Sequence, residues 1–139
     1  MINLKKRILI IEDSLVEQNI IYNALKNIYS TSVAHSGNSG IKLIKNSIPD
    51  LIILDLLMDD GDGWKVIKIL RDDPTTRNLP IIVTTSCLDE EIVCFKLGAS
   101  DFISKPVVPE ILKERIKIHL SLQERITIDE LTGAFNRNK

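Results

Sequence analysis

Short apolar runs alternate with amphipathic stretches along the chain. Three runs are apolar at consecutive residues, at 8–11, 51–54 and 81–83, which is the pattern of parallel strands covered on both faces of a sheet. A more polar run at 31–35 favours an edge strand. The pattern predicts strands at Arg7–Ile11, Thr31–His35, Leu51–Leu54, Ile81–Thr84 and Asp101–Ile103.

Apolar residues spaced three and four apart fall between these runs and predict helices. The last helix begins near Pro109, a favourable first-turn residue, and no Gly or Pro interrupts it before about Ile126. The predicted helices span Ser14–Asn27, Ser39–Lys45, Gly63–Arg71, Leu88–Leu97 and Pro109 to about Ile126.

Regular alternation of strands and helices predicts an α/β fold, with a doubly wound five-stranded parallel sheet between two helical layers. A sheet of this size commonly takes the flavodoxin-like strand order 2-1-3-4-5. In that order the first and third strands are neighbours, and ligands bind where their carboxyl ends meet.

The chain's charge and composition exclude several classes of protein. Its 139 residues carry 18 basic and 19 acidic side chains, for a net charge of -1. A nucleic-acid-binding domain usually has a clear basic excess, so we expect no nucleic-acid partner. No apolar run approaches the ~18 residues of a membrane span, and Cys87 and Cys94 cannot form a disulfide framework. We therefore expect a cytoplasmic protein without membrane contact.

Acidic residues follow the first and third predicted strands. Glu12 and Asp13 come directly after the first, and Asp55 ends the third. Because these strands are expected to be neighbours, their carboxylates converge at one sheet edge, where like charges repel. A hard divalent cation such as Mg²⁺, which prefers oxygen ligands, would neutralise them.

The fourth and fifth strands bring a hydroxyl and an ammonium to the same edge. The run Thr84–Ser86 follows the fourth strand, and Lys105, held extended by the next proline, follows the fifth. Carboxylates, a divalent cation, a hydroxyl and a lysine together indicate a phosphoryl site. Asp55 could itself be the nucleophile and yield an acyl phosphate.

These motifs resemble those of the receiver domains of two-component response regulators, over about residues 7–122. The chain has an acidic pair at 12–13, DLLMDDGDG at 55–63 (similar to D-x-x-M-P-x-x-D-G), PIIVTT at 80–85 and GASDFISKP at 98–106. Each fragment alone is weak evidence, but together, in order and at the expected strand ends, they are highly specific.

The resemblance implies that Asp55 accepts a phosphoryl group from a sensor histidine kinase or a phosphotransfer protein. It also implies a Mg²⁺ site, at which Mn²⁺ could substitute. The ligands would be Asp13, Asp55 and the backbone carbonyl of Leu57, with Glu12 acting through water.

The resemblance further implies that Thr85 and Lys105 bind the phosphoryl oxygens. Phe102, the family's switch aromatic, would follow Thr85 from an exposed to a buried position, and the fourth helix, fifth strand and fifth helix would form the output face, through which two copies could pair. Taken alone, Thr85 could cap a helix and Phe102 could be an ordinary core residue.

Two positions depart from the family's pattern. Asp59 replaces the usual proline after Met58, so the acidic loop could be more mobile and shift the metal affinity. Ser86 stands where a small alanine is common. Neither change removes a chemical role.

The sequence lacks the motifs of other proteins that bind or transfer phosphate groups. The first strand leads into neither G-x-G-x-x-G nor a P-loop, and a phosphatase with an aspartyl nucleophile would usually carry a second acid at Leu57. We therefore expect an active receiver that is not itself an enzyme.

The segment DELTGAFNR at 129–137 is similar to the D-x-L-T-G-x-x-N-R motif that opens the GGDEF domain of diguanylate cyclases. We expect a receiver domain at 1–125, and a linker with the truncated start of a GGDEF domain at 126–139. The alternative for the tail is a local helix start, with a capping box at Thr127 and Glu130. For the parent protein, a receiver that controls a cyclase making cyclic di-GMP and a single-domain regulator acting only through protein contacts both remain open.

Overall fold

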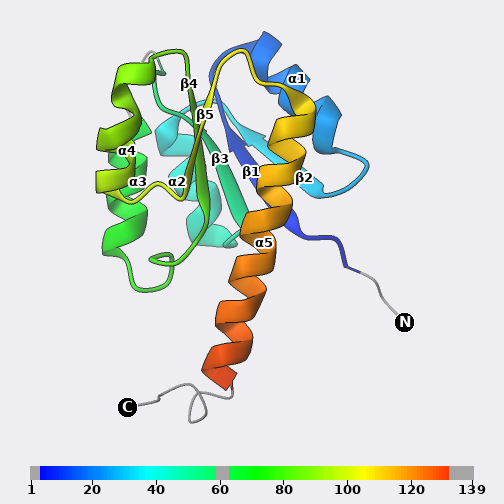
Figure 1. The fold of residues 1–139 in the computed structure, drawn as a ribbon, viewed down its shortest axis with the longest axis vertical. Coiled ribbons are helices and arrows are strands. Elements are labelled where there is room, and N and C mark those ends of the chain that lie inside the picture. Colours follow the sequence, from blue (N-terminus) through cyan, green and yellow to red (C-terminus); the bar gives the residue numbers. More distant parts are fainter. Residues whose placement is uncertain (1–3, 59–62, 132–139) are drawn as a thin grey trace.

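The computed structural model describes residues 4–58 and 63–131, with side chains as far as Glu124. Figure 1 shows a central sheet with helices on both faces. The strands are β1 (Arg7–Ile11), β2 (Ser30–Ala34), β3 (Leu51–Asp55), β4 (Ile81–Thr85) and β5 (Asp101–Ser104). The helices are α1 (Leu15–Leu25), α2 (Gly37–Asn46), α3 (Gly63–Asp72), the 3₁₀ turn η1 (Leu88–Glu90), α4 (Glu91–Leu97) and α5 (Pro109–Leu131).

The sheet is parallel throughout, and its strand order β2-β1-β3-β4-β5 confirms the predicted order and fold class. The register aligns the strand ends: Ile11 lies beside Leu54, and Asp55 beside Thr84. Since Glu12 comes one residue after Ile11, Glu12 and Asp55 reach the same height at the carboxyl edge. Strand register therefore positions the acidic residues.

Alternate residues of the central strands fill separate apolar clusters on the two faces of the sheet. On one face, Ile10 and Ile53 pack with residues of α1 and α5. On the other face, Leu9 and Ile52 pack with residues of α2, α3 and α4. Burial on both faces explains why these strands are apolar at consecutive positions.

Helix ends differ from the predicted ones more than strand ends do. The predicted helix at 88–97 is divided into the 3₁₀ turn η1 and the α-helix α4, and no side chain caps either at its start. α5 continues to Leu131, beyond the predicted end near Ile126, and its lower half extends past the sheet in Figure 1. None of the described helices is long and apolar enough to cross a bilayer.

Candidate functional site

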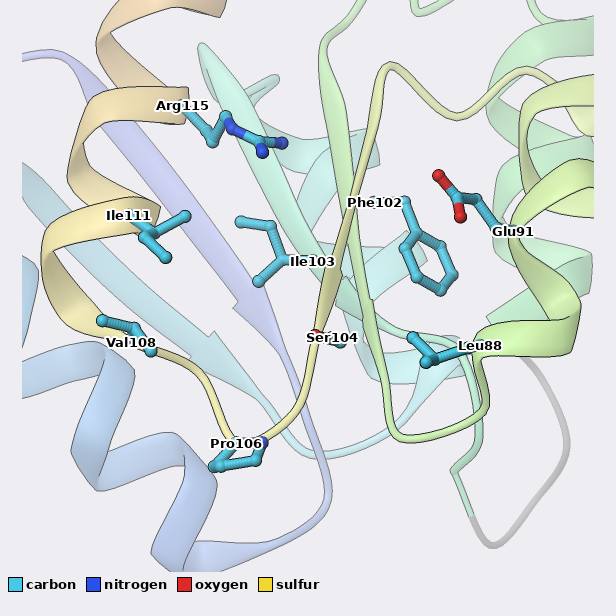
Figure 2. Close-up of a pocket in the computed structure, with 9 residues that line it drawn as sticks. All are labelled: Leu88, Glu91, Phe102, Ile103, Ser104, Pro106, Val108, Ile111 and Arg115. Atoms are coloured by element: carbon cyan, nitrogen blue, oxygen red, sulfur yellow. The ribbon is translucent and has the colours of Figure 1, made fainter.

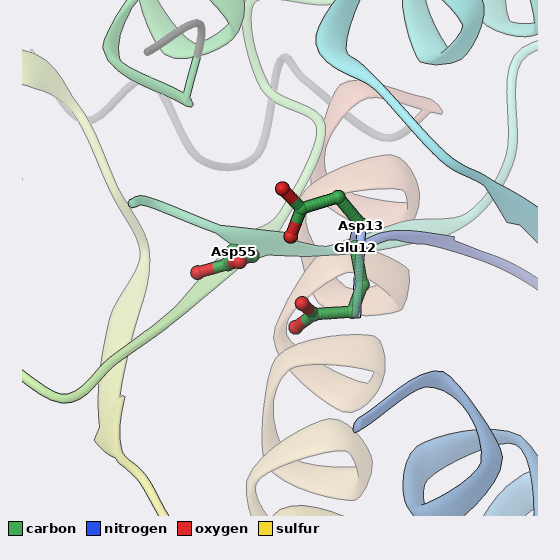
Figure 3. Close-up of side chains that lie close together, drawn as sticks. All are labelled: Glu12, Asp13 and Asp55. Atoms are coloured by element: carbon green, nitrogen blue, oxygen red, sulfur yellow. The ribbon is translucent and has the colours of Figure 1, made fainter. Parts of the chain in front are cut away.

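An acidic cluster lies at the carboxyl edge of the sheet. Glu12 follows β1 and is 1% exposed, while Asp55 closes β3 and is 3% exposed. One carboxylate oxygen from each of these residues and one from Asp13 lie within 4.8 Å of one another. Figure 3 shows the three side chains gathered where β1 and β3 end. The structure thus brings together the acids that the sequence predicts at this edge.

Lys105 brings a positive charge to the acidic cluster. Its Nζ lies 3.1 Å from Oε1 of Glu12 and 3.2 Å from Oδ1 of Asp55. Because Lys105 follows β5, its side chain must reach past the end of β4 to the two carboxylates. Its side chain is only 17% exposed, so water screens these ion pairs weakly.

Burial and neighbouring charges together shift the pKa values of Glu12 and Lys105. Burial, and then the neighbouring Asp55 carboxylate, raise the pKa of Glu12 from an ordinary 4.5 to about 7. Burial alone would lower the pKa of Lys105, but the carboxylates of Asp55 and Glu12 raise it, so the ammonium stays charged at neutral pH. One lysine does not neutralise the acids, and all their donor atoms are oxygens. The residues therefore fit a hard divalent cation.

Backbone amides orient two of the carboxylates. The Leu57 amide donates to Oδ1 of Asp55 at 3.2 Å, and the Ser14 amide donates to Oε2 of Glu12 at 3.1 Å. Leu57, whose carbonyl the resemblance makes a metal ligand, thus lies on the tight turn that follows Asp55. The acidic loop at 59–62, with the departure at Asp59, lies outside the described residues.

The two threonines that end β4 have different surroundings. Thr85 is fully buried, and its Oγ1 accepts a hydrogen bond from the Cys87 amide at 3.1 Å. Thr84 lies beside Asp55 in the sheet, and its buried Oγ1 has no hydrogen-bond partner among the described residues. The hydroxyl of Thr85 therefore connects the end of β4 to the start of η1.

Phe102 is 9% exposed and belongs to the core cluster that faces α2, α3 and α4. It also lines a groove of about 280 Å³ between η1–α4 and α5. Figure 2 shows the groove, with Leu88 and Glu91 on one side and Ile111 and Arg115 on the other. In this structure Phe102 occupies the buried position that the resemblance assigns to the switched form.

Gln18 is a contributor to the site that the sequence analysis did not single out. It is 5% exposed, and its Nε2 lies 2.6 Å from the carbonyl of Glu12, to which it donates, and 2.8 Å from Nδ1 of His35. These contacts link the end of β1 to the loop after β2. The available signal was a polar residue on the inward face of the first helix, three residues before Ile21 and seven before Leu25.

Gly63 is expected to be intolerant of a side chain. A Cβ at this position would lie 2.7 Å from Cα of Leu56 and closer still to its carbonyl oxygen, and backbone next to Asp55 cannot rotate away. We expect Gly63→Ala to lower the free energy of unfolding by about 2 kcal/mol, as overpacked sites do. Urea titration followed by the fluorescence of the single tryptophan, Trp64, measures this.

Gly40→Ala is the matched control. Its Cβ would meet mainly Cδ1 of Ile11, at 2.5 Å, and that atom is the end of a flexible side chain that can rotate away. We expect less than half the loss seen for Gly63→Ala. Equal losses in the two variants would contradict a backbone clash at Leu56.

The chain matches one protein-family model over most of its length. The model described as "Response regulator receiver domain" matches residues 8–117. The chain belongs to this family. It is thus a receiver domain of two-component signalling, a class that binds Mg²⁺ at an acidic pocket, interacts with histidine kinases or phosphotransfer proteins, and is not catalytic by itself.

Relatives and solved structures agree with this assignment. The chain is 36% identical to response regulator PleD of Caulobacter vibrioides over 132 residues, or 90% of this chain and 28% of that protein. It is 33% identical to a probable cyclic di-GMP phosphodiesterase of Vibrio cholerae over 115 residues, or 81% of this chain and 26% of that protein. It is 31% identical to the transcriptional regulatory protein CiaR of Streptococcus pneumoniae over 132 residues, or 95% of this chain and 55% of that protein.

A CheY-like response regulator receiver domain protein from Methanospirillum hungatei superposes with a TM-score of 0.80 at 27% identity, covering 88% of this chain and 98% of that one. By contrast, the chain spans only 26% to 55% of the length of the three relatives above. The family match therefore applies to the receiver domain, and the names of the longer relatives differ in the activities that they state.

Proposed function

We propose that Asp55 is the phosphoacceptor of this receiver domain. A carboxylate oxygen of Asp55 would attack the phosphorus of a phosphohistidine on a sensor kinase or phosphotransfer protein, while the phosphorus–nitrogen bond to the imidazole breaks. The observation that carries this proposal is that Asp55 lies beside two other acids and the ammonium of Lys105. That ammonium can follow an incoming phosphoryl group and bind its oxygens as a point charge.

Asp13, Asp55 and the carbonyl of Leu57 would hold a Mg²⁺ ion, with Glu12 binding it through water. When bound, the ion supplies charge neutralisation for the phosphoryl oxygens. Burial, and then the neighbouring Asp55 carboxylate, raise the pKa of Glu12, and a cation that binds the acids would offset both effects. Mn²⁺ accepts the same oxygen ligands and is the second ion to test.

We further propose that Thr85 binds the phosphoryl group and that α4, β5 and α5 form the output face. The Thr85 hydroxyl lies at the end of β4, next to the strand that carries Asp55. Thr85 pairs with Ser104 of β5, and Ser104 lines the groove on this face together with Phe102, so a change at Thr85 can alter the groove's shape. A groove lined by both apolar and polar side chains, with Glu91 and Arg115 on opposite sides, suits a protein partner, including a second copy of the chain.

For the parent protein, we propose an attached diguanylate cyclase that makes cyclic di-GMP, with the receiver ending near residue 125 and a linker following at 126–139. The supporting observations are the GGDEF-like motif at 129–137, which mostly lies outside the described residues, and a relative whose name, probable cyclic di-GMP phosphodiesterase, concerns the same dinucleotide. The alternative is a single-domain regulator that acts only through phosphorylation-dependent protein contacts. The reading frame beyond codon 139 distinguishes the two.

Intact-mass measurement after incubation with acetyl phosphate tests the phosphoacceptor assignment. We expect a gain of one phosphoryl group with Mg²⁺, and no gain when EDTA replaces Mg²⁺ or when Asp55→Asn replaces the wild type. Asp72→Asn, an exposed acid on α3, is the matched control and should be phosphorylated normally. A full mass gain in Asp55→Asn would rule out Asp55 as the phosphoacceptor.

A further inference from the structure

The segment formed by η1 and α4 is attached to the protein mainly through its C-terminal half. Cys94 is the buried side chain of α4, and Leu97 packs against the core from a half-buried position. Ile92, in the first turn of α4, is 68% exposed. No side-chain hydrogen bond caps the segment, either at Cys87 before η1 or at Glu90 before α4. The two ends are therefore held unequally.

Arg71, near the end of α3, clamps the C-terminal end of α4. Its Nε donates to the carbonyl of Gly98 at 2.8 Å, and Gly98 ends α4 in the left-handed conformation at φ 114°. Its Nη1 donates to the carbonyls of Leu79 at 2.7 Å and Arg77 at 3.0 Å. The planar guanidinium has enough fixed donors to make these bonds together. One side chain thus joins α3, the α4–β5 turn and the entry to β4.

Packing and a second hydrogen-bond bridge strengthen the clamp. A Cβ at Gly98 would lie 2.9 Å from Cγ of Arg71, so the aliphatic part of the arginine lies directly on the turn. Oγ of Ser100 accepts from the Ile81 amide at 3.0 Å and from Nη2 of Arg71 at 3.4 Å. The turn is therefore tied to the first residue of a buried strand.

The N-terminal end of the segment is connected to the phosphoryl site through Thr85. The Cys87 amide donates to Oγ1 of Thr85 at 3.1 Å. A Thr85 hydroxyl that turns toward a phosphoryl group on Asp55 would carry its lone pairs away from Cys87, and that amide would lose this acceptor. Phosphorylation would then first affect the N-terminal end of the η1–α4 segment, which is its less buried end.

We propose that Arg71 is the pivot of α4, holding the C-terminal end in place while phosphorylation of Asp55 frees the N-terminal end. The helix then tilts instead of detaching, and the part of the groove lined by Leu88 and Glu91 changes shape. Arg71 is a positioning residue, because none of its hydrogen bonds described above reaches the acidic cluster. This inference rests on the proposed function, since phosphorylation is what turns Thr85.

Hydrogen–deuterium exchange of the full chain with Mg²⁺, with and without fluoroberyllate as a phosphoryl stand-in, tests the pivot. In the wild type we expect fluoroberyllate to raise exchange about tenfold in a peptide at 86–92 and to leave 93–100 unchanged. In Arg71→Met we expect fluoroberyllate to raise the exchange rate of both peptides about tenfold. Without fluoroberyllate, the substitution alone should raise these rates much less. Arg77→Met, an exposed arginine of the neighbouring loop, should behave like the wild type.

If Arg71→Met does not fold, Arg71→Lys serves instead, because one ammonium cannot bond the carbonyls of Gly98 and Leu79 in the same geometry. We then expect the exchange pattern of Arg71→Met at smaller amplitude. Protection of 93–100 that persists in the fluoroberyllate-bound variant, or that falls equally in both states, would contradict the pivot. So would an unchanged 86–92 peptide in wild-type protein that binds fluoroberyllate, as monitored by Trp64 fluorescence. If the wild type fails to bind fluoroberyllate, the proposed function itself is overturned.

Discussion

Replacing Lys105 with methionine is expected to destabilise the Mg²⁺-free protein by about 3 kcal/mol at pH 7. The ammonium lies within 3.2 Å of oxygens of both Glu12 and Asp55, whose side chains are 1% and 3% exposed. Removing the Lys105 ammonium leaves these buried carboxylates without that counter-charge. The free-energy cost of the uncompensated buried charge exceeds the net stabilisation that the ion pairs themselves provide. Protonation of one carboxylate limits the loss, so lowering the pH should recover part of it.

Urea titration in EDTA, followed by the fluorescence of Trp64, measures this effect. Lys113→Met is the matched control, because Lys113 pairs at 3.4 Å with Glu110, whose side chain is 83% exposed. An exposed pair contributes about 0.5 kcal/mol or less. The account of a charge-crowded site would be wrong if the two variants lost similar stability, or if Mg²⁺ failed to restore any stability to Lys105→Met.

The Mg²⁺-free protein is also expected to lose stability as the pH rises from 4.5 to about 7. The folded state raises the pKa of Glu12 to about 7, so between these values it binds a proton that the unfolded chain has released. The contribution of Glu12 to the free energy of unfolding is therefore fully present below pH 4.5. It is lost as the pH rises to about 7, by on the order of 3 kcal/mol. The pKa of the hydrogen-bonded Asp101 carboxyl is lowered in the folded state. Its contribution to stability therefore changes only at pH values below this window.

Unfolding free energies measured at several pH values in EDTA test this dependence. Glu12→Gln should flatten the profile between pH 5 and 7, because the amide does not titrate, whereas Glu110→Gln should leave it unchanged. Saturating Mg²⁺ should also flatten the wild-type profile, since the cation favours the ionised carboxylate. A wild-type profile that rises steadily with pH in EDTA would contradict the assigned environment of Glu12.

The hydrophobic pattern was sufficient to predict the sheet. Consecutive apolar residues at 51–54 require burial on both faces, and the structure buries them on both faces. Helix ends were predicted less well because they depend on weak local signals. The segment at 88–97 begins without a side-chain cap and starts as a 3₁₀ turn, a choice that apolar spacing does not encode.

The acids of the site could be predicted because strand order alone brings Glu12 and Asp55 to one edge. Contacts between distant side chains could not be predicted in this way. Lys105 is 93 residues from Glu12 in the sequence, and its sharing between two carboxylates depends on distances that only the packed fold determines. The same holds for Gln18, whose role follows from a single buried contact with the Glu12 carbonyl.

Locating the phosphoryl group tests the central claim most directly. The protein would be treated with acetyl phosphate and Mg²⁺ and reduced with borohydride, which converts an aspartyl phosphate to homoserine, and then digested and sequenced by mass spectrometry. We expect homoserine at position 55 alone. Homoserine at another acid, such as Asp13, or a phosphoryl group that survives borohydride on a serine or histidine, would contradict the assignment of Asp55 as the phosphoacceptor.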